Sequence, residues 1–531
     1  MTPANRKILV GIILLLAIFG RFWHITTMPG GLFPDQAANG EDAISILHGH
    51  LQPFYERGNG REALFFYLQA VLIAIFGIGV WPMFFASALV GTATVYFTYA
   101  AGRRMFGDLV GILAGLFIAT NQWHVSLSRT GFRAITIPLF MALTVYFFMG
   151  LFQTKNPKTR IWQAIGCGVS FGLGWYTYIA FRAFVGVIVI VAVVLLLQSL
   201  LRKPRLFGFK MYRGAIVALF LSAVVTMTPL FAYFNNHPGS FAGRSGQVSI
   251  LNPDINKGNL LGTATDVLEK SILAFFTAGD VNPRHNVPGY PFLSPIPAVF
   301  GLIGIIIALI RSIQYLHRLL RGRHTGQTLA FFIMLLLLAI MLVPAVATAE
   351  GIPHGLRSIG EIPVVFWLAG IGGAWFIHRL KRLPSLNARR IAMGALLILL
   401  ALTCVYDLFL YFGVSASLPK YWYEYRSDLT TVSNYLNQRA KLNSGRSYLV
   451  LDEFSVQTVH FLTTKYNYPY ILLKPEKCET TTIQQGDVII FNQSTLPDAE
   501  RYINKHPEIK ELMRTKNQFE ETTMIVFGLK P

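Results

Sequence analysis

Cysteine and charged residues are both scarce in this 531-residue sequence. Its three cysteines, Cys167, Cys404 and Cys478, lie far apart, so they form neither a zinc-binding pattern nor the disulfide framework of a small secreted domain. Charged residues make up only 14% of the chain, whereas hydrophobic residues make up 53%. With a mean hydropathy of +0.48 and repeated long apolar runs, this composition is typical of a protein that crosses a membrane several times.

Acidic residues are few relative to basic ones, with 26 Asp and Glu against 46 Lys and Arg and a formal net charge of +20. The basic residues lie mostly in short connections between apolar runs, as the topology of a membrane protein requires. We therefore predict no nucleic-acid partner.

Eleven apolar segments are long enough to span a bilayer, which takes roughly 20 residues. They are 8–24, 81–101, 109–127, 134–152, 161–178, 181–201, 213–234, 293–310, 326–347, 359–378 and 391–412. The first follows Arg6 and Lys7 and has no clear Ala-x-Ala cleavage site after it. We therefore expect it to be a retained span rather than a removed signal peptide.

A twelfth apolar segment, residues 64–79, is shorter, and the basic connections indicate whether it crosses. If it does not cross and the N-terminus is cytoplasmic, the basic clusters at 103–104, 155–160, 202–210, 311–323 and 379–390 all face the cytoplasm. If it crosses, all of them face outward, against the positive-inside rule. The sequence thus predicts about eleven spans, with 64–79 at or re-entering the interface.

The tail after residue 414 has a different character. It is polar, with apolar runs of strand length at 447–451, 470–473, 487–491 and 524–527, and helical patterns at 429–436, 456–463 and 498–505. This alternation predicts a small α/β domain with a partly parallel sheet. The tail has no glycine-rich phosphate loop and no nucleophile elbow, so we predict no catalytic role for it. The expected domains are 1–414, with outer loops 25–80 and 235–292, and 415–531.

Asp35 stands out in the first outer loop, directly after a membrane span. Ionisable groups at this depth are costly unless they have a function or a partner. The alternative is that Asp35 caps a short surface helix, because Pro34-Asp35 before an alanine-rich run is a common helix start. Both interpretations fit the local sequence.

The remaining outer loops carry single Arg, His and Tyr residues, a pattern that favours a site for a specific anion over a broad charged face. The candidates are Arg61, Glu62, Arg129, Arg133, Tyr178, Arg182, His354 and Arg357. Structural ion pairs, aromatic anchoring and snorkelling at the interface are the alternatives. Ser358-Ile-Gly-Glu361 fits a capping box, which would place His354 and Arg357 just before a helix N-terminus, where anions are favoured.

These motifs, in this order and on one side of the membrane, resemble a known family. Behind the Asp35 loop come Gly60-Arg-Glu-Ala-Leu-Phe-Phe-Tyr67, Gly102-Arg-Arg-Met-Phe-Gly107, Ser128-Arg129 and Pro353-His-x-x-Arg357. Over residues 5–380 or so, the chain resembles the GT-C superfamily of membrane glycosyltransferases. It is most similar to the branch of protein O-mannosyltransferases and aminoarabinose (lipid A) transferases.

The resemblance implies an inverting transfer of a sugar from a polyprenyl-phosphate donor to a hydroxyl group of a lipid, protein or glycan, at the extracytoplasmic face. Asp35 matches the catalytic carboxylate of the family and would act as general base. Arg133, His354 and Arg357 would hold the phosphate, and Arg61, Tyr178 and Arg182 would line the site.

The sequence departs from the family pattern at several positions. The family's Asp-Glu pair reads Asp35-Gln36 here, its Lys-Pro-Pro reads Arg61-Glu62-Ala63, and its Thr-Lys-Gly reads Thr177-Tyr178-Ile179. The Thr-Asp-x-Pro of relatives reads Thr136-Ile137-Pro138 without the Asp. The loss of the second acid weakens the case for a metal at position 36, and either Arg182 replaces the missing lysine or the phosphate is held elsewhere.

The resulting prediction is a multi-pass, α-helical protein of the plasma membrane with GT-C fold, a cytoplasmic N-terminus and an extracytoplasmic α/β tail. Its partners would be the lipid bilayer, a polyprenyl-phosphate-sugar donor and the acceptor. No cofactor and no metal-ligating residue is predicted, although the sequence leaves a divalent metal open. The alternatives are a transporter or flippase of lipid-linked sugars and a non-catalytic membrane scaffold.

Overall fold

The computed structural model describes residues 1–201, 209–242, 249–321, 328–442, 445–466 and 469–530. Its internal packing divides the chain into two compact units. The first, called the membrane unit below, contains Met1–Trp23, Gln52–Phe65 and Ser87–Ser415. The second, called the tail unit, contains His24–Leu51, Phe66–Ala86 and Ala416–Pro531. The sequence predicted a division at residue 414. In the structure, two segments of the N-terminal part, His24–Leu51 and Phe66–Ala86, also belong to the tail unit.

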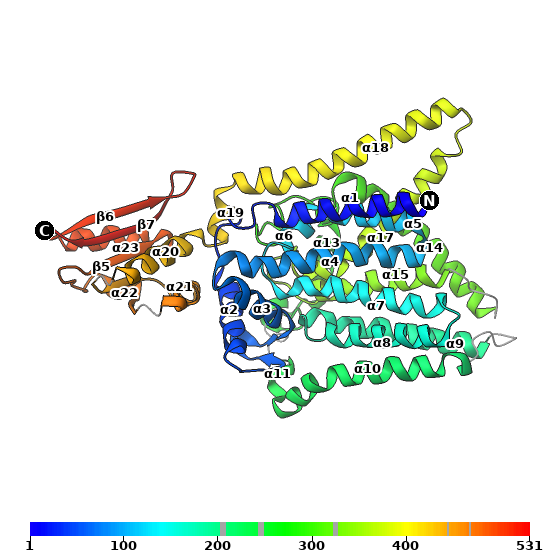
Figure 1. Ribbon diagram of the computed structural model, residues 1–531, viewed down its shortest axis with the longest axis horizontal. Helices are drawn as coiled ribbons and strands as arrows, with labels where there is room; N and C mark the ends of the chain where they lie inside the picture. The colour runs from blue at the N-terminus through cyan, green and yellow to red at the C-terminus, as the bar shows by residue number, and fades with distance from the viewer. Residues whose placement is uncertain (202–208, 243–248, 322–327, 443–444, 467–468, 531) are drawn as a thin grey trace. The chain divides into compact units, whose positions relative to one another are not determined.

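Long apolar helices make up most of the membrane unit and lie side by side (Figure 1). They are α1 (Pro3–Phe22), α4 (Val80–Phe106), α5 (Asp108–Thr120), α7 (Thr136–Gln153), α8 (Pro157–Gly174), α9 (Phe184–Leu201), α10 (Phe209–Asn236), α14 (Pro295–Leu320), α15 (Thr328–Met341), α17 (Ile362–Leu380) and α18 (Leu386–Phe409). The first residues of α4 belong to the tail unit. Each of the eleven predicted spans is therefore mainly helical over its described residues, and residues 326 and 327 of the span 326–347 lie outside them.

Nine helices among the described residues are long and apolar enough to cross a membrane. The predicted spans 109–127 and 161–178 are not among them. The first is divided, because Asn121 has a ψ of 125° that ends α5 and its side chain caps the short α6 (Gln122–Leu127). The second, α8, carries Lys158 and Arg160 in its first turns. The α-helical membrane architecture is confirmed, with the span at 109–127 interrupted.

The segment 64–79 forms α3 (Leu64–Phe76), a helix of 13 residues. At 1.5 Å per residue it is about 20 Å long, which is shorter than the hydrocarbon core of a bilayer, about 30 Å. Its length agrees with the prediction that this segment does not cross.

Glycines allow the closest packing between helices of the membrane unit. A Cβ atom at Gly372 of α17 would lie 1.9 Å from the carbonyl oxygen of Phe300 in α14. A Cβ at Gly304 would lie 2.0 Å from the carbonyl oxygen of Leu368. Because neither position has room for a side chain, the two backbones approach as closely as in small-residue interfaces of membrane helices.

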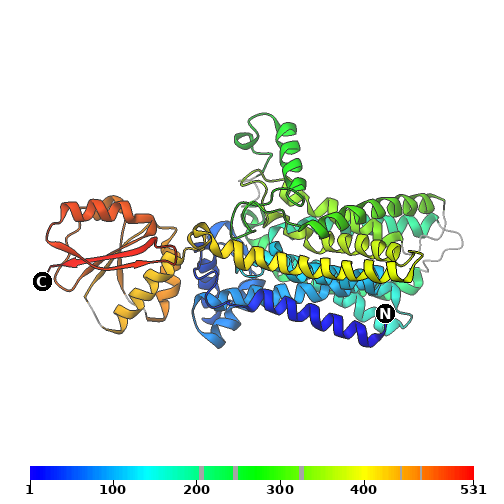
Figure 2. The ribbon, with the colours of Figure 1, turned by 90° about the horizontal axis from the view of Figure 1, so that it is seen from above.

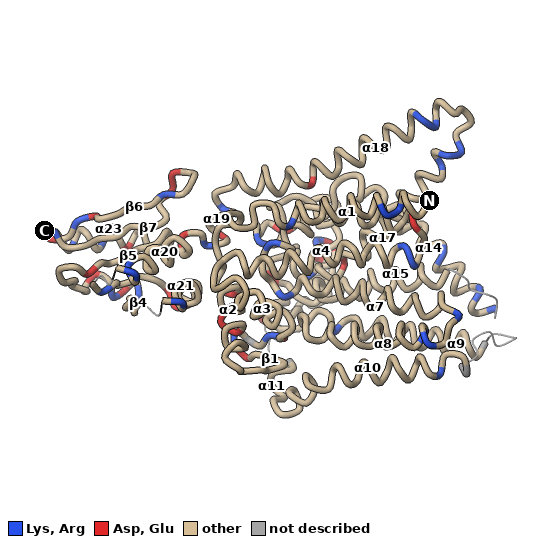
Figure 3. Tube along the Cα trace, in the orientation of Figure 1, with Lys and Arg blue, Asp and Glu red and all other residues tan. Residues whose placement is uncertain are grey.

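The basic residues at the end of α14 and at the start of α18 lie at one end of the helices of the membrane unit, whereas other arginines of this unit lie elsewhere in it (Figure 3). The predicted basic clusters 202–210 and 311–323 extend into 202–208 and 322–323, which lie outside the described residues. The described residues of these clusters lie at the same end of the helices, as the sequence predicts.

The loop between α10 and α14 contains three short helices, α11 (Pro238–Ala242), α12 (Pro253–Asn256) and α13 (Leu260–Leu273). Figure 2 shows α13, in green, running across the direction of the long helices and projecting from their side. Smaller elements of this unit are the hairpin of β1 (Phe54–Tyr55) and β2 (Arg61–Glu62), the 3₁₀ turns η1 (Arg57–Asn59), η2 (Arg133–Ile135), η3 (Ile179–Ala183) and η4 (Arg357–Glu361), α16 (Val343–Val346), and the turns η5 (Leu410–Val414) and η6 (Ser415–Ser417) after α18.

The tail unit contains α2 (Pro34–Leu47) and a five-stranded sheet with the order β4-β3-β5-β7-β6. Its strands are β3 (Ser447–Val450), β4 (Tyr470–Leu473), β5 (Val488–Asn492), β6 (Ile509–Lys516) and β7 (Thr522–Leu529), and its helices are α19 (Pro419–Glu424), α20 (Ser427–Lys441), α21 (Val456–Thr463), α22 (Pro475–Cys478) and α23 (Leu496–Lys505), with the turns η7 (Thr464–Tyr466) and η8 (Gln493–Thr495). Strands β4, β3 and β5 are parallel, whereas β5, β7 and β6 are antiparallel. The partly parallel sheet is confirmed.

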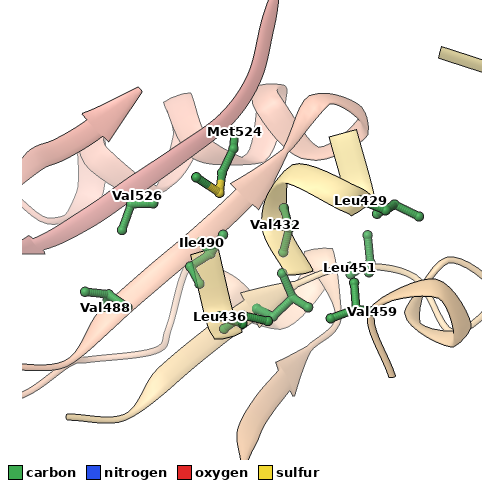
Figure 4. Packing of buried hydrophobic residues seen from close by; sticks show 10 residues of the cluster. Leu429, Val432, Leu436, Leu451, Val459, Val488, Ile490, Met524 and Val526 are labelled. Atoms are coloured by element: carbon green, nitrogen blue, oxygen red, sulfur yellow. The ribbon is translucent and has the colours of Figure 1, made fainter. Parts of the chain in front are cut away.

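Two apolar layers hold this sheet. On one face, Leu429, Val432 and Leu436 of α20 pack with Val459 of α21 against Ile490 and Val526 (Figure 4). On the other face, Ala499 and Tyr502 of α23 pack against Phe491 and Phe527. Residues alternate between the two faces along each strand, so both faces are covered and the sheet has a core on each side.

Candidate functional site

Glu62 joins two predicted site residues of the membrane unit. Its Oε2 lies 3.3 Å from Nε of Arg133, and its Oε1 lies 3.4 Å from a terminal nitrogen of Arg182. Glu62 is buried, with 2% of its surface exposed. Since two guanidinium groups share one carboxylate, these ion pairs leave one positive charge in excess. We call these residues, with Tyr178, the cationic cluster.

Aromatic rings surround the cationic cluster. The Arg133 guanidinium lies 5.0 Å from the centre of the Tyr178 ring, and that of Arg182 lies 4.5 Å from the ring of Phe241. Arg182 also donates to the backbone oxygen of Phe241 at 2.6 Å. Cation–π contacts strengthen in desolvated surroundings, so the rings hold both guanidinium groups in place. Four residues that the sequence predicted separately, from β2, η2, η3 and the residue before η3, therefore meet here.

Arg61 precedes Glu62 in β2, and neighbouring residues of a strand point to opposite faces. Its Nε donates to the backbone oxygen of Arg57 at 3.1 Å. This bond closes the loop between β1 and β2, and a role of Arg61 in the site remains a prediction.

Arg129 is completely buried and holds structural elements together. It donates to the backbone oxygen of Arg21 at the end of α1 and to the hydroxyl of Tyr411 after α18, at 2.8 and 3.2 Å. Its guanidinium also lies over the ring of Phe412. These contacts support the structural interpretation of Arg129, and its predicted phosphate contact stays untested.

A second cluster combines Asp280, His285 and His354. His285 Nδ1 donates to Asp280 Oδ2 at 2.9 Å, and His354 Nδ1 lies 4.0 Å from the same oxygen. The two imidazole rings stack with their centres 4.6 Å apart. The backbone N–H of Gly355 donates to Asp280 Oδ2 at 2.8 Å and fixes the carboxylate.

These three side chains can hold a metal ion. One potential ligand atom from each lies within 4.8 Å of the others. Two imidazoles and one carboxylate are a ligand set that zinc accepts, with a fourth position left for water or substrate. The sequence indicated no metal site because Asp280 and His285 belong to one loop and His354 to another.

The pKa of His285 is lowered, and burial is the main cause. The positive charges of Arg284 and Arg357 act in the same direction, whereas the hydrogen bond and the charge of Asp280 oppose them. A neutral imidazole is the form that a metal ion requires.

Residues 130–133 bring the two clusters near each other. The Phe132 ring, next to Arg133, lies 5.9 Å from the ring of His285, and the Thr130 hydroxyl donates to the backbone oxygen of Arg284 at 3.0 Å. Arg357 also belongs to this region, because its positive charge contributes to the lowered pKa of His285. Its guanidinium group forms an ion pair with the Glu350 carboxylate at 2.9 Å.

The predicted capping box at Ser358–Glu361 is wrong. Residues Arg357–Glu361 form the 3₁₀ turn η4, and α17 begins only at Ile362. Glu361 is fully buried, and within the described residues neither of its side-chain oxygens has a hydrogen-bond partner. The 3₁₀ turn places this residue at the N-cap rather than the N3 position, so it cannot reach back to Ser358.

Asp35 lies in the tail unit, in the first turn of α2. Its side chain is exposed and makes no side-chain hydrogen bond or ion pair within the described part of the chain. The side-chain oxygen of Gln36 instead accepts the N–H of Phe33 at the start of the helix, at 2.9 Å. This geometry disfavours the capping role for Asp35 and leaves its carboxylate accessible.

The tail packs directly on the helix that carries Asp35. Glu41 Oε1 lies 2.7 Å from Nδ1 of His460, and the Thr458 hydroxyl donates to the backbone oxygen of Leu32 at 3.0 Å. Between these contacts the ring of Phe461 covers Gly40. Helix α21 therefore fixes α2 within the tail unit.

The chain has the GT-C fold, as the sequence resemblance predicted. Residues 63–227 match a family described as dolichyl-phosphate-mannose-protein mannosyltransferase. No curated protein matches the sequence.

Solved structures match over nearly the whole chain. ArnT from Cupriavidus metallidurans in the apo state is 13% identical, with a TM-score of 0.56, and the match covers 98% of this chain and 97% of ArnT. The same protein bound to undecaprenyl phosphate gives a TM-score of 0.54 over 99% and 98% of the two chains, again at 13% identity.

The Archaeoglobus fulgidus oligosaccharyltransferase tethered to an acceptor peptide is 12% identical, with a TM-score of 0.50 over 100% of this chain and 74% of that one. The sequence resemblance ended near residue 380, whereas these matches include the tail. The similarity in fold therefore extends further than the motifs indicated.

Proposed function

We propose that this protein transfers a sugar from a polyprenyl-phosphate donor to an acceptor hydroxyl at the extracytoplasmic face of the membrane, with inversion. The cationic cluster carries this proposal, because its excess positive charge is of the kind that a lipid phosphate needs, in a chain with the GT-C fold. The match to ArnT bound to undecaprenyl phosphate supports the class of donor.

In the proposed reaction, Asp35 accepts the proton of the acceptor hydroxyl while that oxygen forms a bond to the anomeric carbon of the sugar. The bond between the anomeric carbon and the phosphate oxygen breaks, and the polyprenyl phosphate leaves with the electron pair. Arg133 and Arg182 stabilise the negative charge that develops on the leaving phosphate. His354 and Arg357 are proposed to support the phosphate from the neighbouring loop.

The orientation in the membrane is part of the proposal. The described residues of the predicted basic connections at the end of α14 and the start of α18 lie at one end of the membrane unit, and by the positive-inside rule that end faces the cytoplasm. Helices α1 and α18 then have their other ends outside, so the tail is extracytoplasmic.

The experiment that tests the function is a transfer assay with Asp35→Asn in proteoliposomes, using the lipid-linked sugars of the native membrane as donors. A matched control exists in Asp254→Asn, because Asp254 is also exposed, follows a proline and lies in the first turn of a helix. We expect D35N to lose transfer by a factor of about 10²–10⁴, as for removal of a general base, while D254N keeps it.

Mass spectrometry of envelope glycans, lipids and glycoproteins with and without the protein identifies the sugar and acceptor. Full transfer by D35N would contradict the general-base role. Movement of lipid-linked sugar across the bilayer without any transfer by the wild-type protein would favour the flippase alternative.

A further inference from the structure

Helix α13 exposes several apolar side chains, and three of them lie along one stripe, with Leu260 and Leu273 exposed at the two ends of the helix. Leu261, Leu268 and Ile272 are 77%, 39% and 44% exposed. Their spacing of seven and four residues places them on the same face of a helix. Such a stripe is costly in water unless something covers it.

The rest of the helix surface is divided into two further faces. Val267 and Ser271 are buried against the membrane unit. Across the helix from the apolar stripe lies a polar face on which Lys270 pairs with Asp266 at 2.8 Å, with both side chains more than half exposed. The buried face thus lies between the apolar stripe and the charged residues. This is the pattern of a helix that lies at a membrane surface.

Backbone contacts place α13 where two membrane-spanning helices end. Its residues contact α16, the last turn of the predicted span Thr328–Val346. The N–H of Phe292, just before α14, donates to the backbone oxygen of Ala274, just after α13, at 2.9 Å. The helix is therefore tied to the end of one span and to the start of another.

The loop at residues 249–251 is also tied to the end of a span and also exposes an apolar side chain. Ile250 donates its N–H to the backbone oxygen of Ala347 at 3.0 Å, and Ser249 pairs with Thr348. Leu251, the next residue, is 70% exposed, and Val343 in α16 is 52% exposed. Exposed apolar side chains thus occur both on α13 and at the end of the span that it contacts, and α13 runs across the spans rather than along them (Figure 2).

We infer that α13 is an interfacial helix that inserts Leu261, Leu268 and Ile272 into the leaflet adjoining this end of the membrane unit. The occupant of the stripe is lipid rather than a second copy or an acceptor protein, because α13 contacts α16 at the end of one span and its C-terminal end is tied to the start of another, α14. Segment 274–293 follows α13 directly and contains Asp280 and His285. Insertion therefore holds this segment at the depth of the lipid headgroups. This inference does not depend on the proposed transfer reaction.

Fluorescence quenching in the full-length protein tests the inference. Single cysteines at Leu261→Cys and Leu268→Cys are labelled with an environment-sensitive dye, with Lys270→Cys on the polar face as matched control. The three native cysteines are buried, so the unsubstituted chain gives the background labelling. The labelled protein is reconstituted in nanodiscs of phosphatidylcholine and phosphatidylglycerol, with and without spin-labelled lipid.

The dyes at positions 261 and 268 are expected to emit at shorter wavelength, to be quenched by the spin-labelled lipid, and to resist aqueous iodide. The dye at position 270 is expected to show the reverse. In a second variant, Leu261→Glu and Leu268→Glu are combined with a dye at Ile272→Cys, and the quenching by lipid is expected to be lost.

Two results would overturn the inference. Iodide quenching at position 261 equal to that at position 270 would place the stripe in water. Protection from both iodide and spin-labelled lipid would mean that protein covers it.

Discussion

The ring of Phe461 lies directly on the backbone of Gly40, so that a Cβ atom at position 40 would be 2.4 Å from the ring. This contact joins α21 of the tail to α2, which carries Asp35 five residues earlier. The tail domain, for which the sequence indicated no catalytic role, therefore holds the helix of the proposed general base.

The substitution Gly40→Ala tests this contact. We expect it to lower the stability of the tail unit by about 1–3 kcal/mol, because the added methyl group overpacks against Phe461. Sugar transfer should fall with it, since α2 shifts or loosens. The measurement is thermal unfolding together with hydrogen exchange of α2 in the full-length protein.

Gly394→Ala is the matched control, because a Cβ at position 394 of α18 meets nothing within 4 Å. It should be neutral or slightly stabilising, as alanine is the better helix former. Equal effects of the two substitutions would contradict the importance of the Phe461 contact.

Arg133→Ala and Arg182→Ala are each expected to weaken binding of undecaprenyl phosphate. Hydrogen bonds to charged groups contribute about 1.5–3 kcal/mol, which corresponds to roughly ten- to hundredfold in Kd. Native mass spectrometry or calorimetry with the purified protein measures this change, and Arg390→Ala, an exposed arginine near the start of α18, serves as control.

The substitution Glu62→Gln separates the effect of the Glu62 charge on phosphate binding from its effect on the stability of the fold. It removes the negative charge shared by the two arginines, so the lipid phosphate should bind at least as tightly as to the wild-type protein, even though loss of a buried ion pair destabilises the fold. Weaker binding by E62Q than by R133A would argue against a phosphate site at the cationic cluster.

Zinc is expected to bind at Asp280, His285 and His354, and a chelator to lower the melting temperature of the purified protein. His285→Ala and His354→Ala should each reduce the bound zinc measured by mass spectrometry of the metal. His237→Ala is the control, because His237 lies in the same loop but stacks on Tyr233 and is exposed. Unchanged zinc content in all three variants would exclude this cluster as the metal site.

Asp452 gives the tail a defined acid sensitivity. Burial alone would raise the pKa of Asp452, but hydrogen bonds from Ser455 and Phe454 and the charge of Arg426 outweigh burial and lower it. The unfolded chain therefore binds the proton first as the pH falls below about 4. The stabilisation is complete above that pH and is lost as the pH falls toward the lowered pKa.

Asp452→Asn should destabilise α21 at neutral pH and remove this part of the acid sensitivity. Hydrogen exchange of residues 456–463 in the full-length protein, compared with the wild-type protein at each pH, provides the measurement. Glu453→Gln is the control, since Glu453 is exposed and pairs with Lys474 at the surface. An unchanged difference between neutral and acidic pH in D452N would contradict the role of Asp452.

Strong hydrophobic patterns made much of the fold predictable. The four predicted strands of the tail are present because Leu449, Ile490 and Val526 repeat on faces that the sheet buries. Strand β6 was missed, because it is an edge strand whose residues Lys510 to Arg514 are mostly polar and exposed. The predicted span 109–127 is divided because one asparagine, Asn121, caps a new helix, a local effect that a hydropathy average does not register.

The site was predictable only residue by residue. Glu62, Arg133, Tyr178 and Arg182 could each be predicted as outer-loop polar residues, but their shared carboxylate depends on packing between distant segments. No role was predicted for Asp280 or His285, because their partner His354 lies 69 residues beyond His285 in the sequence. Asp35 as general base remains a prediction, and its carboxylate is exposed in the first turn of α2.

The single surplus charge of the cationic cluster has a consequence for turnover. A lipid-linked sugar is a phosphodiester with one negative charge, which the surplus neutralises. After transfer the carrier is a phosphomonoester, and such groups have a charge of about −1.5 to −2 at neutral pH. In the proposed reaction the spent carrier is therefore held more strongly than the loaded one, so that its departure, rather than bond formation, would limit the rate and free carrier would act as a competitive inhibitor.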